Sequence, residues 1–120
     1  MVGLEPGDAK ILRNPGGRVT DAALVALVLG VALLNVSRII IVQHTRCAMA
    51  SASERELQQR VGDSLGQDAS WLTVGAIDDQ HQALRADVRR VRSHPLMPAH
   101  VDVAGFVYDV DTGLLGDPVD

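Results

Sequence analysis

The sequence of 120 residues has 47% hydrophobic residues, and its 11 basic and 15 acidic side chains give a formal net charge of -4 at pH 7. This length and composition predict one globular domain with a core of Val, Leu, Ile and Ala, and they exclude a disordered chain. The excess of acidic over basic side chains argues against a nucleic-acid partner, because a protein that binds nucleic acid needs a clustered basic surface. The single cysteine, Cys47, excludes an intrachain disulfide and favours a cytoplasmic setting.

The N-terminal third predicts a strand, a glycine loop and a helix. We expect a turn at residues 5–8, where a signal peptide would need an apolar segment, then a strand over about residues 8–13. Residues 13–17 form a loop, interpreted as a tight turn before a helix in preference to a loop whose glycines let the backbone approach another group closely. The helix, residues 21–35, is apolar nearly all round, which predicts burial by the sheet and by a partner subunit.

A membrane span is the competing reading of this helix. Residues 22–34 are thirteen apolar residues in a row. A bilayer span needs about 20 such residues, so a buried helix is the better interpretation. We therefore expect no membrane partner.

The next element is a strand over residues 38–43, whose four consecutive branched aliphatics are typical of a parallel strand buried on both faces. The strand leads directly into His44-x-x-Cys47. Imidazole and thiolate are both zinc ligands, and sites in open α/β sheets form beyond the carboxyl ends of strands. His44 and Cys47 are therefore candidate metal ligands, although a His and a Cys at this spacing alone form a weak motif.

The rest of the chain predicts two helices and a hairpin. We expect helices from Ser53 to Leu65 and from Asp78 to about Ser93, joined by a loop in which Trp71 fills a hydrophobic gap. A strand follows over residues 101–110, then a turn at 111–113 and a short return strand. The whole predicts a single α/β domain, residues 1–120, with a mostly parallel sheet, flanking helices and a C-terminal antiparallel hairpin.

Four blocks of this sequence, in order, resemble the β-class carbonic anhydrases. They are Leu12-Arg13-Asn14-Pro15-Gly16-Gly17, Val19-Thr20-Asp21, His44-Thr45-Arg46-Cys47-Ala48-Met49 and the hairpin from Gly105 to Gly113. The resemblance implies a zinc lyase that hydrates carbon dioxide reversibly to bicarbonate. It also implies His44 and Cys47 as two of three protein ligands, and a homodimer or larger homo-oligomer.

The sequence departs from the family pattern in its metal ligands. The family places its first cysteine and an Asp-Arg pair in a Cys-x-Asp-x-Arg strand before the turn at residues 5–8, and this sequence begins at Met1. We expect those groups to be absent and assign no catalytic residue. Arg46 places a cation between the ligands, which disfavours zinc if it points inward. Four side chains are weaker candidates for a replacement ligand: Asp102, Asp109, His94 and His100.

The resemblance also places that first strand in the sheet centre, between residues 8–13 and 38–43. Without it, these two segments close up against each other, or a partner chain fills the gap, or the fold is only marginally stable. Three hypotheses follow for function: a zinc enzyme with an impaired site, an inactive homologue that acts as an assembly or binding module, and, far behind, a membrane-associated protein using residues 22–34.

Overall fold

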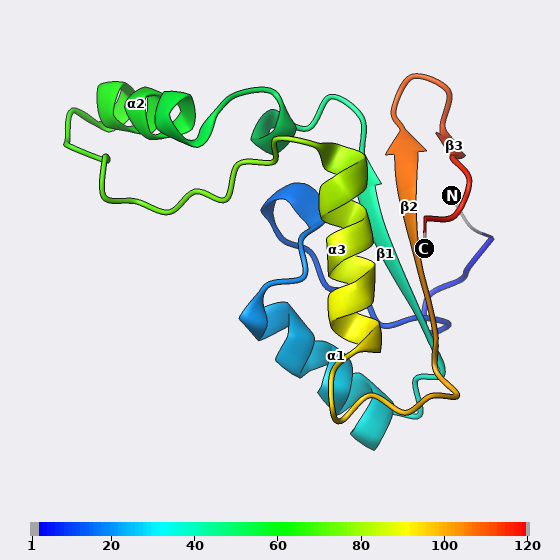
Figure 1. Ribbon diagram of the computed structural model, residues 1–120. Coiled ribbons are helices and arrows are strands. Elements are labelled where there is room, and N and C mark those ends of the chain that lie inside the picture. The colour runs from blue at the N-terminus through cyan, green and yellow to red at the C-terminus, as the bar shows by residue number, and fades with distance from the viewer. Residues whose placement is uncertain (1–2, 120) are drawn as a thin grey trace.

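The computed structural model describes residues 3–119, which form an α/β fold with one three-stranded sheet (Figure 1). The helices are α1 (Asp21–Leu33), α2 (Glu54–Leu65) and α3 (Gln80–Arg92). The strands are β1 (Arg38–His44), β2 (Asp102–Asp109) and β3 (Leu114–Leu115), and 3-10 turns occur at Pro15–Gly17 and Ala48–Ala50. The predicted fold class and C-terminal hairpin are confirmed.

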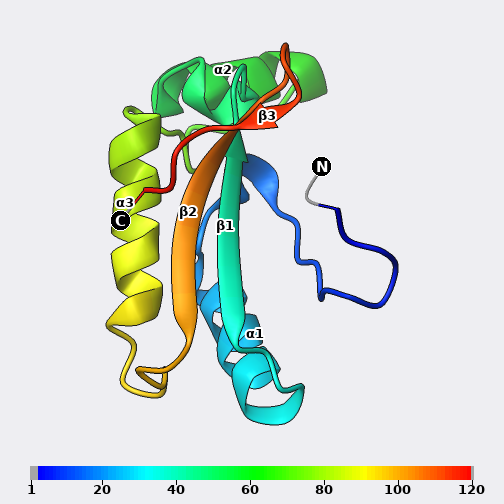
Figure 2. The ribbon, with the colours of Figure 1, turned by 90° about the vertical axis from the view of Figure 1, so that its right-hand side faces the viewer.

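The sheet has the order β1-β2-β3, with β1 and β2 parallel and β2 and β3 antiparallel. Side chains of β1 alternate between its two faces, so Ile39 and Ile41 are buried while Arg38 and Ile40 are exposed, and the prediction that this strand is buried on both faces was wrong. The buried face packs on α3, whose Leu84, Val88 and Val91 are fully buried and belong to the same core cluster. The other face of β1 and β2 is not covered by a helix (Figure 2). The core is aliphatic, as predicted.

The helix boundaries follow ordinary capping chemistry. Thr20, Ser53 and Asp79 each accept a hydrogen bond from a first-turn N–H of α1, α2 and α3, at 3.0 to 3.1 Å. At the other end of α2, Gly66 adopts the left-handed conformation with φ of 67°. The third cap is Asp79 and not Asp78, so α3 begins two residues later than predicted. Among residues 3–119, no helix combines the length and hydrophobicity of a membrane span.

Two further sequence-based expectations were wrong. Residues 8–13 form no strand and are exposed, because no neighbouring strand within residues 3–119 offers them hydrogen-bond partners. The α1 helix buries Ala23 and Gly30 and leaves its outer face uncovered, so the predicted burial of that face by a partner subunit stays a prediction. Trp71 fills no gap, since 76% of its surface is exposed and its indole N–H donates to the Asp68 carbonyl at 2.9 Å.

One buried ion pair fixes the start of α1 against α3. The Asp87 carboxylate on α3 is 3% exposed and accepts from the Arg18 guanidinium at 2.7 and 3.2 Å. It also accepts from the Val19 backbone N–H at 3.1 Å. The hydrogen bond with Asp87 raises the pKa of Arg18 above its ordinary value. This pair joins segments 69 residues apart and holds the loop at residues 14–18 beside the sheet.

The α2 helix projects away from the sheet and from the other two helices (Figure 1). Its first-turn carboxylate, Glu54, accepts from the backbone N–H groups of Val74 at 2.7 Å and of Gly75 and Ala76 at 2.9 Å. These bonds, led by those from Ala76 and Val74, lower the pKa of Glu54. Glu54 therefore stabilises residues 74–76 of the loop that connects α2 to α3.

Candidate metal centre

The His-x-x-Cys segment forms a turn at the carboxyl end of β1. His44 is the last residue of the strand and is exposed. Cys47 is 5% exposed and precedes the 3-10 turn at Ala48–Ala50. The structure thus places both predicted ligands at the rim of the parallel sheet, where α/β proteins carry their sites.

Hydrogen bonds attach this turn to β2, to the segment that follows it and to α3. The Thr45 N–H donates to the Tyr108 carbonyl at 2.9 Å, and the Thr45 hydroxyl oxygen accepts from the Val110 N–H at 3.0 Å. The Gln80 side chain, at the start of α3, donates to the His44 carbonyl at 2.8 Å. A ligand position supported from two other elements is the arrangement that a preorganised site requires.

The His44 ring is hydrogen-bonded in a way that suits metal binding. Its Nδ1 atom lies 2.7 Å from the Thr45 carbonyl oxygen. A carbonyl oxygen only accepts, so Nδ1 carries the hydrogen of this bond. In the neutral ring Nε2 then has a free lone pair, and this is the usual pairing in metal-bound histidines.

The cation between the two ligands is directed to a partner outside the turn. Arg46 has a positive φ of 57°, a conformation that costs a non-glycine residue some stability. Its guanidinium pairs with Asp111, in the turn between β2 and β3, at 3.1 Å. Both side chains are more than half exposed, so the positive charge of Arg46 is balanced at the surface.

The sheet topology excludes three of the four candidate replacement ligands. Because β1 and β2 are parallel with Arg38 opposite Asp102, the start of β2 lies at the opposite end of the sheet from His44. Asp102 lies there, and His94 and His100 precede it in the chain. Asp109 lies at the correct end, but its carboxylate caps the following turn by accepting from the N–H groups of residues 111 and 112, at 2.8 and 3.3 Å.

The donor set therefore amounts to two residues. Within residues 3–119, no three His, Cys, Asp or Glu side chains are grouped so as to hold a metal ion. A catalytic zinc site has three protein ligands. His44 and Cys47 suit zinc chemically, but the described residues do not complete such a site.

Gln43, directly before His44, was missed by the sequence interpretation. It is 1% exposed, and neither polar atom of its carboxamide has a hydrogen-bond partner among the described residues. It faces the core side of the sheet together with Ile39 and Ile41. The signal in the sequence was a single amide at the end of an otherwise aliphatic strand.

The glycine loop approaches the same end of β1. Gly17 has φ of 60°, and a Cβ atom at this position would lie 2.5 Å from the Val42 carbonyl oxygen. Asn14 secures the loop by donating to the Arg18 carbonyl and accepting from its N–H, at 2.7 and 2.9 Å. Gly17 thus serves a close approach to β1, whereas a Cβ at Gly16 would lie 3.1 Å from Ile77.

The sequence and structure are similar to those of known carbonic anhydrases. The carbonic anhydrase family matches residues 1–115. Beta-carbonic anhydrase 1 of Mycobacterium tuberculosis is 31% identical over 98% of this chain and 71% of its own length. A carbon disulfide hydrolase of Acidithiobacillus thiooxidans is 31% identical over 93% of this chain and 65% of its own. The crystal structure of carbonic anhydrase from Streptococcus mutans superposes with a TM-score of 0.87 at 35% identity, over 98% of this chain and 70% of that one.

Proposed function

The chain belongs to the β-carbonic anhydrase family, and from that premise we propose that it serves the reversible hydration of carbon dioxide to bicarbonate. In this proposal His44 and Cys47 are two of the protein ligands of a zinc ion. The observation that carries it is the hydrogen bond from His44 Nδ1 to the Thr45 carbonyl, which leaves Nε2 free for a metal. Zinc in such sites lowers the pKa of bound water to about 7.

The residues of this chain have defined parts in the proposal. The bonds from Thr45 and Gln80 hold the turn, so that the imidazole and the thiol keep their positions when the metal is absent. The pairing of Arg46 with Asp111 keeps a positive charge engaged outside the turn. A cytoplasmic setting, expected from the single cysteine, is part of the same proposal.

Zinc content and carbon dioxide hydration, measured on the purified chain, test this function. We expect zinc binding that is lost in His44→Ala and Cys47→Ser and retained in His100→Ala, which removes a histidine from the opposite end of the sheet. Carbon disulfide is a useful second substrate, because one relative is a carbon disulfide hydrolase. A chain that binds no zinc, or turnover that survives both ligand substitutions, would refute the proposal.

A second candidate is a member of the family without catalysis, acting as an assembly or binding module. The observation that favours it is the absence of a three-donor group among residues 3–119. The same zinc and turnover measurements separate it from the first, since stoichiometric zinc with turnover would exclude it.

We also propose that the chain forms a homodimer or a larger homo-oligomer through the outer face of α1. Val25, Leu29 and Leu33 on this helix are 60%, 49% and 72% exposed. Contiguous apolar surface of this kind marks an interface. Light scattering after gel filtration should give a mass that is a multiple of the chain mass, and Leu29→Glu should reduce it. A monomer at all concentrations would contradict the proposal.

A further inference from the structure

The α3 helix concentrates positive charge on a protein that is otherwise acidic. It holds four of the 11 basic residues of the chain, Arg85, Arg89, Arg90 and Arg92, and one of the 15 acidic ones. That acidic residue, Asp87, is buried. The rest of the chain therefore has seven basic and 14 acidic side chains. No other helix or strand of residues 3–119 covers the outer side of α3 (Figure 1, Figure 2), so its solvent side is a positive surface.

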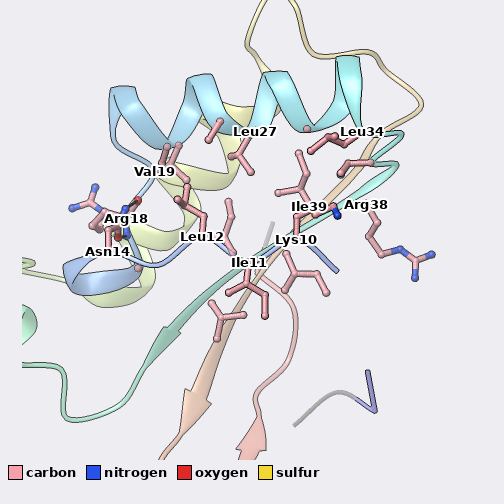
Figure 3. Close-up of a pocket in the computed structure, with 18 residues that line it drawn as sticks. Lys10, Ile11, Leu12, Asn14, Arg18, Val19, Leu27, Leu34, Arg38 and Ile39 are labelled. Atoms are coloured by element: carbon pink, nitrogen blue, oxygen red, sulfur yellow. Dashed lines mark hydrogen bonds between the residues drawn. The ribbon is translucent and has the colours of Figure 1, made fainter. Parts of the chain in front are cut away.

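Several arginines of the fold have an aspartate as counter-ion. Arg18 and Arg38 line the cavity between α1 and β1 (Figure 3). Arg18 is paired with Asp87 and Arg38 with Asp102, at 2.7 and 3.9 Å. These two guanidinium groups are balanced within the chain, so they have little attraction left for an external anion.

On α3 only part of the positive charge is balanced. Arg90 pairs with Asp21, and Arg92 donates to a backbone carbonyl of β2. Arg85 and Arg89 are exposed, and within residues 3–119 neither side chain has a hydrogen-bond or ion-pair partner. These two guanidinium groups can therefore bind an anion from outside the chain.

The helix itself offers these two arginines no counter-ion. On a helix surface, the usual partner of an arginine is a carboxylate three or four residues away. The residues at those distances from Arg85 and Arg89 are His, Gln, Val, Ala, Ser or Arg, and none is acidic. In α2, by contrast, Arg60 has Glu56 four residues before it and Asp63 three residues after it.

The helix dipole does not account for the pair. Arg89 lies in the last turn of α3, where the dipole favours a cation. Arg85 lies before that turn, and two like charges four residues apart repel each other. A pair of arginines that the helix does not stabilise is best explained by a negative charge outside it.

The two arginines form a narrow positive strip. They are one helical turn apart, about 6 Å along the axis, and point to the same side of α3. Gln82 and Ala86 are exposed beside them and carry no charge, and Ala86 leaves room for a partner. We call these four residues the arginine face. Its two cations match two carboxylates at positions i and i+4 of another helix, because those carboxylates have the same spacing.

The charge of the rest of the protein selects among anionic partners. A nucleic acid or an anionic bilayer extends well beyond the arginine face and would meet the acidic remainder of the surface, which repels it. A short acidic helix contacts the arginine face alone. Electrostatic complementarity therefore favours a local acidic segment over an extended polyanion.

We propose that the arginine face binds an acidic helix of another protein, which presents glutamates at positions i and i+4 to Arg85 and Arg89. Ion pairs between exposed groups add little affinity and mainly orient the partner, so the contact is weak and sensitive to salt. This proposal supplies a partner for the binding-module function. It depends on neither zinc nor turnover, so its test succeeds or fails separately from theirs.

Titration of the isotope-labelled full chain with a helical peptide, followed by NMR, tests the proposal. The probe is an alanine-rich peptide with glutamates at i and i+4. One control peptide has glutamine at both positions, and a second has the same composition with the glutamates two residues apart, on different sides of the helix. We expect the probe to shift the side-chain Nε–H signals of Arg85 and Arg89. It should bind about fivefold more tightly than either control, and more weakly as salt is added.

Two matched double substitutions locate the binding. Arg85→Glu with Arg89→Glu reverses the arginine face, whereas Arg55→Glu with Arg60→Glu makes the same change of net charge on α2. All four side chains are exposed, so both variants should keep the wild-type circular dichroism. We expect only the α3 variant to lose the glutamate peptide. The α3 variant should instead bind a peptide with lysines at i and i+4.

Four results would overturn the proposal: no binding of the glutamate peptide, equal binding of either control peptide, equal loss with both double variants, or tighter binding of duplex DNA or anionic vesicles at Arg85 and Arg89. A fifth is a lower mass of the α3 variant than of the wild type in light scattering, because a second copy would then cover the arginine face.

Discussion

Removal of the Asp87 carboxylate is the sharpest test of how this small fold is held together. In Asp87→Ala the Val19 N–H, on a residue only 5% exposed, loses its acceptor. An unsatisfied buried donor costs about 1–3 kcal/mol. Arg18 also loses two charged hydrogen bonds, but its side chain is 30% exposed and can turn to water, so this loss is discounted to about 1 kcal/mol. The free energy of unfolding should fall by about 3 kcal/mol.

Urea denaturation followed by circular dichroism measures this loss, and the Tm should fall by roughly 10 °C. Asp87→Asn keeps an acceptor oxygen for the Val19 N–H and removes the charge, so it should cost about half as much. Asp102→Ala, which breaks an exposed pair of 3.9 Å with Arg38, is the control and should change stability by less than about 0.5 kcal/mol. Equal losses for Ala and Asn at position 87, or a loss below the control, would refute the reasoning.

Three further outcomes are expected. Hydrogen bonds lower the pKa of Glu54, so its contribution to folding stability is complete above the ordinary glutamate pKa of about 4.3. That contribution is lost as the pH falls through the lower pKa of the folded state. Amide exchange at residues 74–76 should therefore stay slow at about pH 5 and become fast in Glu54→Gln. Gly105→Ala places a Cβ 2.8 Å from a Val88 methyl group and should cost about 1–3 kcal/mol in urea denaturation, without loss of the helical circular dichroism. Leu84→Ala, at a fully buried site, should cost about 3 kcal/mol, whereas Leu114→Ala, at a site 67% exposed, should be nearly neutral; similar values for both would contradict the described core.

Local patterns were enough to predict the helices and the C-terminal hairpin. Ser53 and Gly66 mark the ends of α2 through backbone chemistry that needs no other part of the chain. The aliphatic run of β1 likewise identifies a strand. Residues 8–13 show the limit of this method, because a strand exists only where another strand completes its hydrogen bonds, and no property of Ile11 or Leu12 reveals whether one is adjacent.

Local sequence patterns predicted the candidate metal centre only in part. His44 and Cys47 adjoin a recognisable strand, so their place at the sheet rim followed from the sequence. The contacts that support them join segments far apart: Gln80 on α3, Val110 after β2 and Asp111 in the hairpin turn. Such contacts depend on how β1 and β2 pair, and the register of that pairing is not written in either strand alone.

The pairing of β1 with β2 has a consequence for synthesis on the ribosome. Arg38 is matched with Asp102, so 64 further residues must be added before the partner strand exists. At about 5–20 residues per second, this delay is roughly 3–13 s. During it, the aliphatic segment 39–42 leaves the exit tunnel with neither edge satisfied, a state prone to aggregation. The nascent chain should therefore engage chaperones in proportion to that waiting time, and slower translation of the residues between β1 and β2 should lower the yield of folded protein.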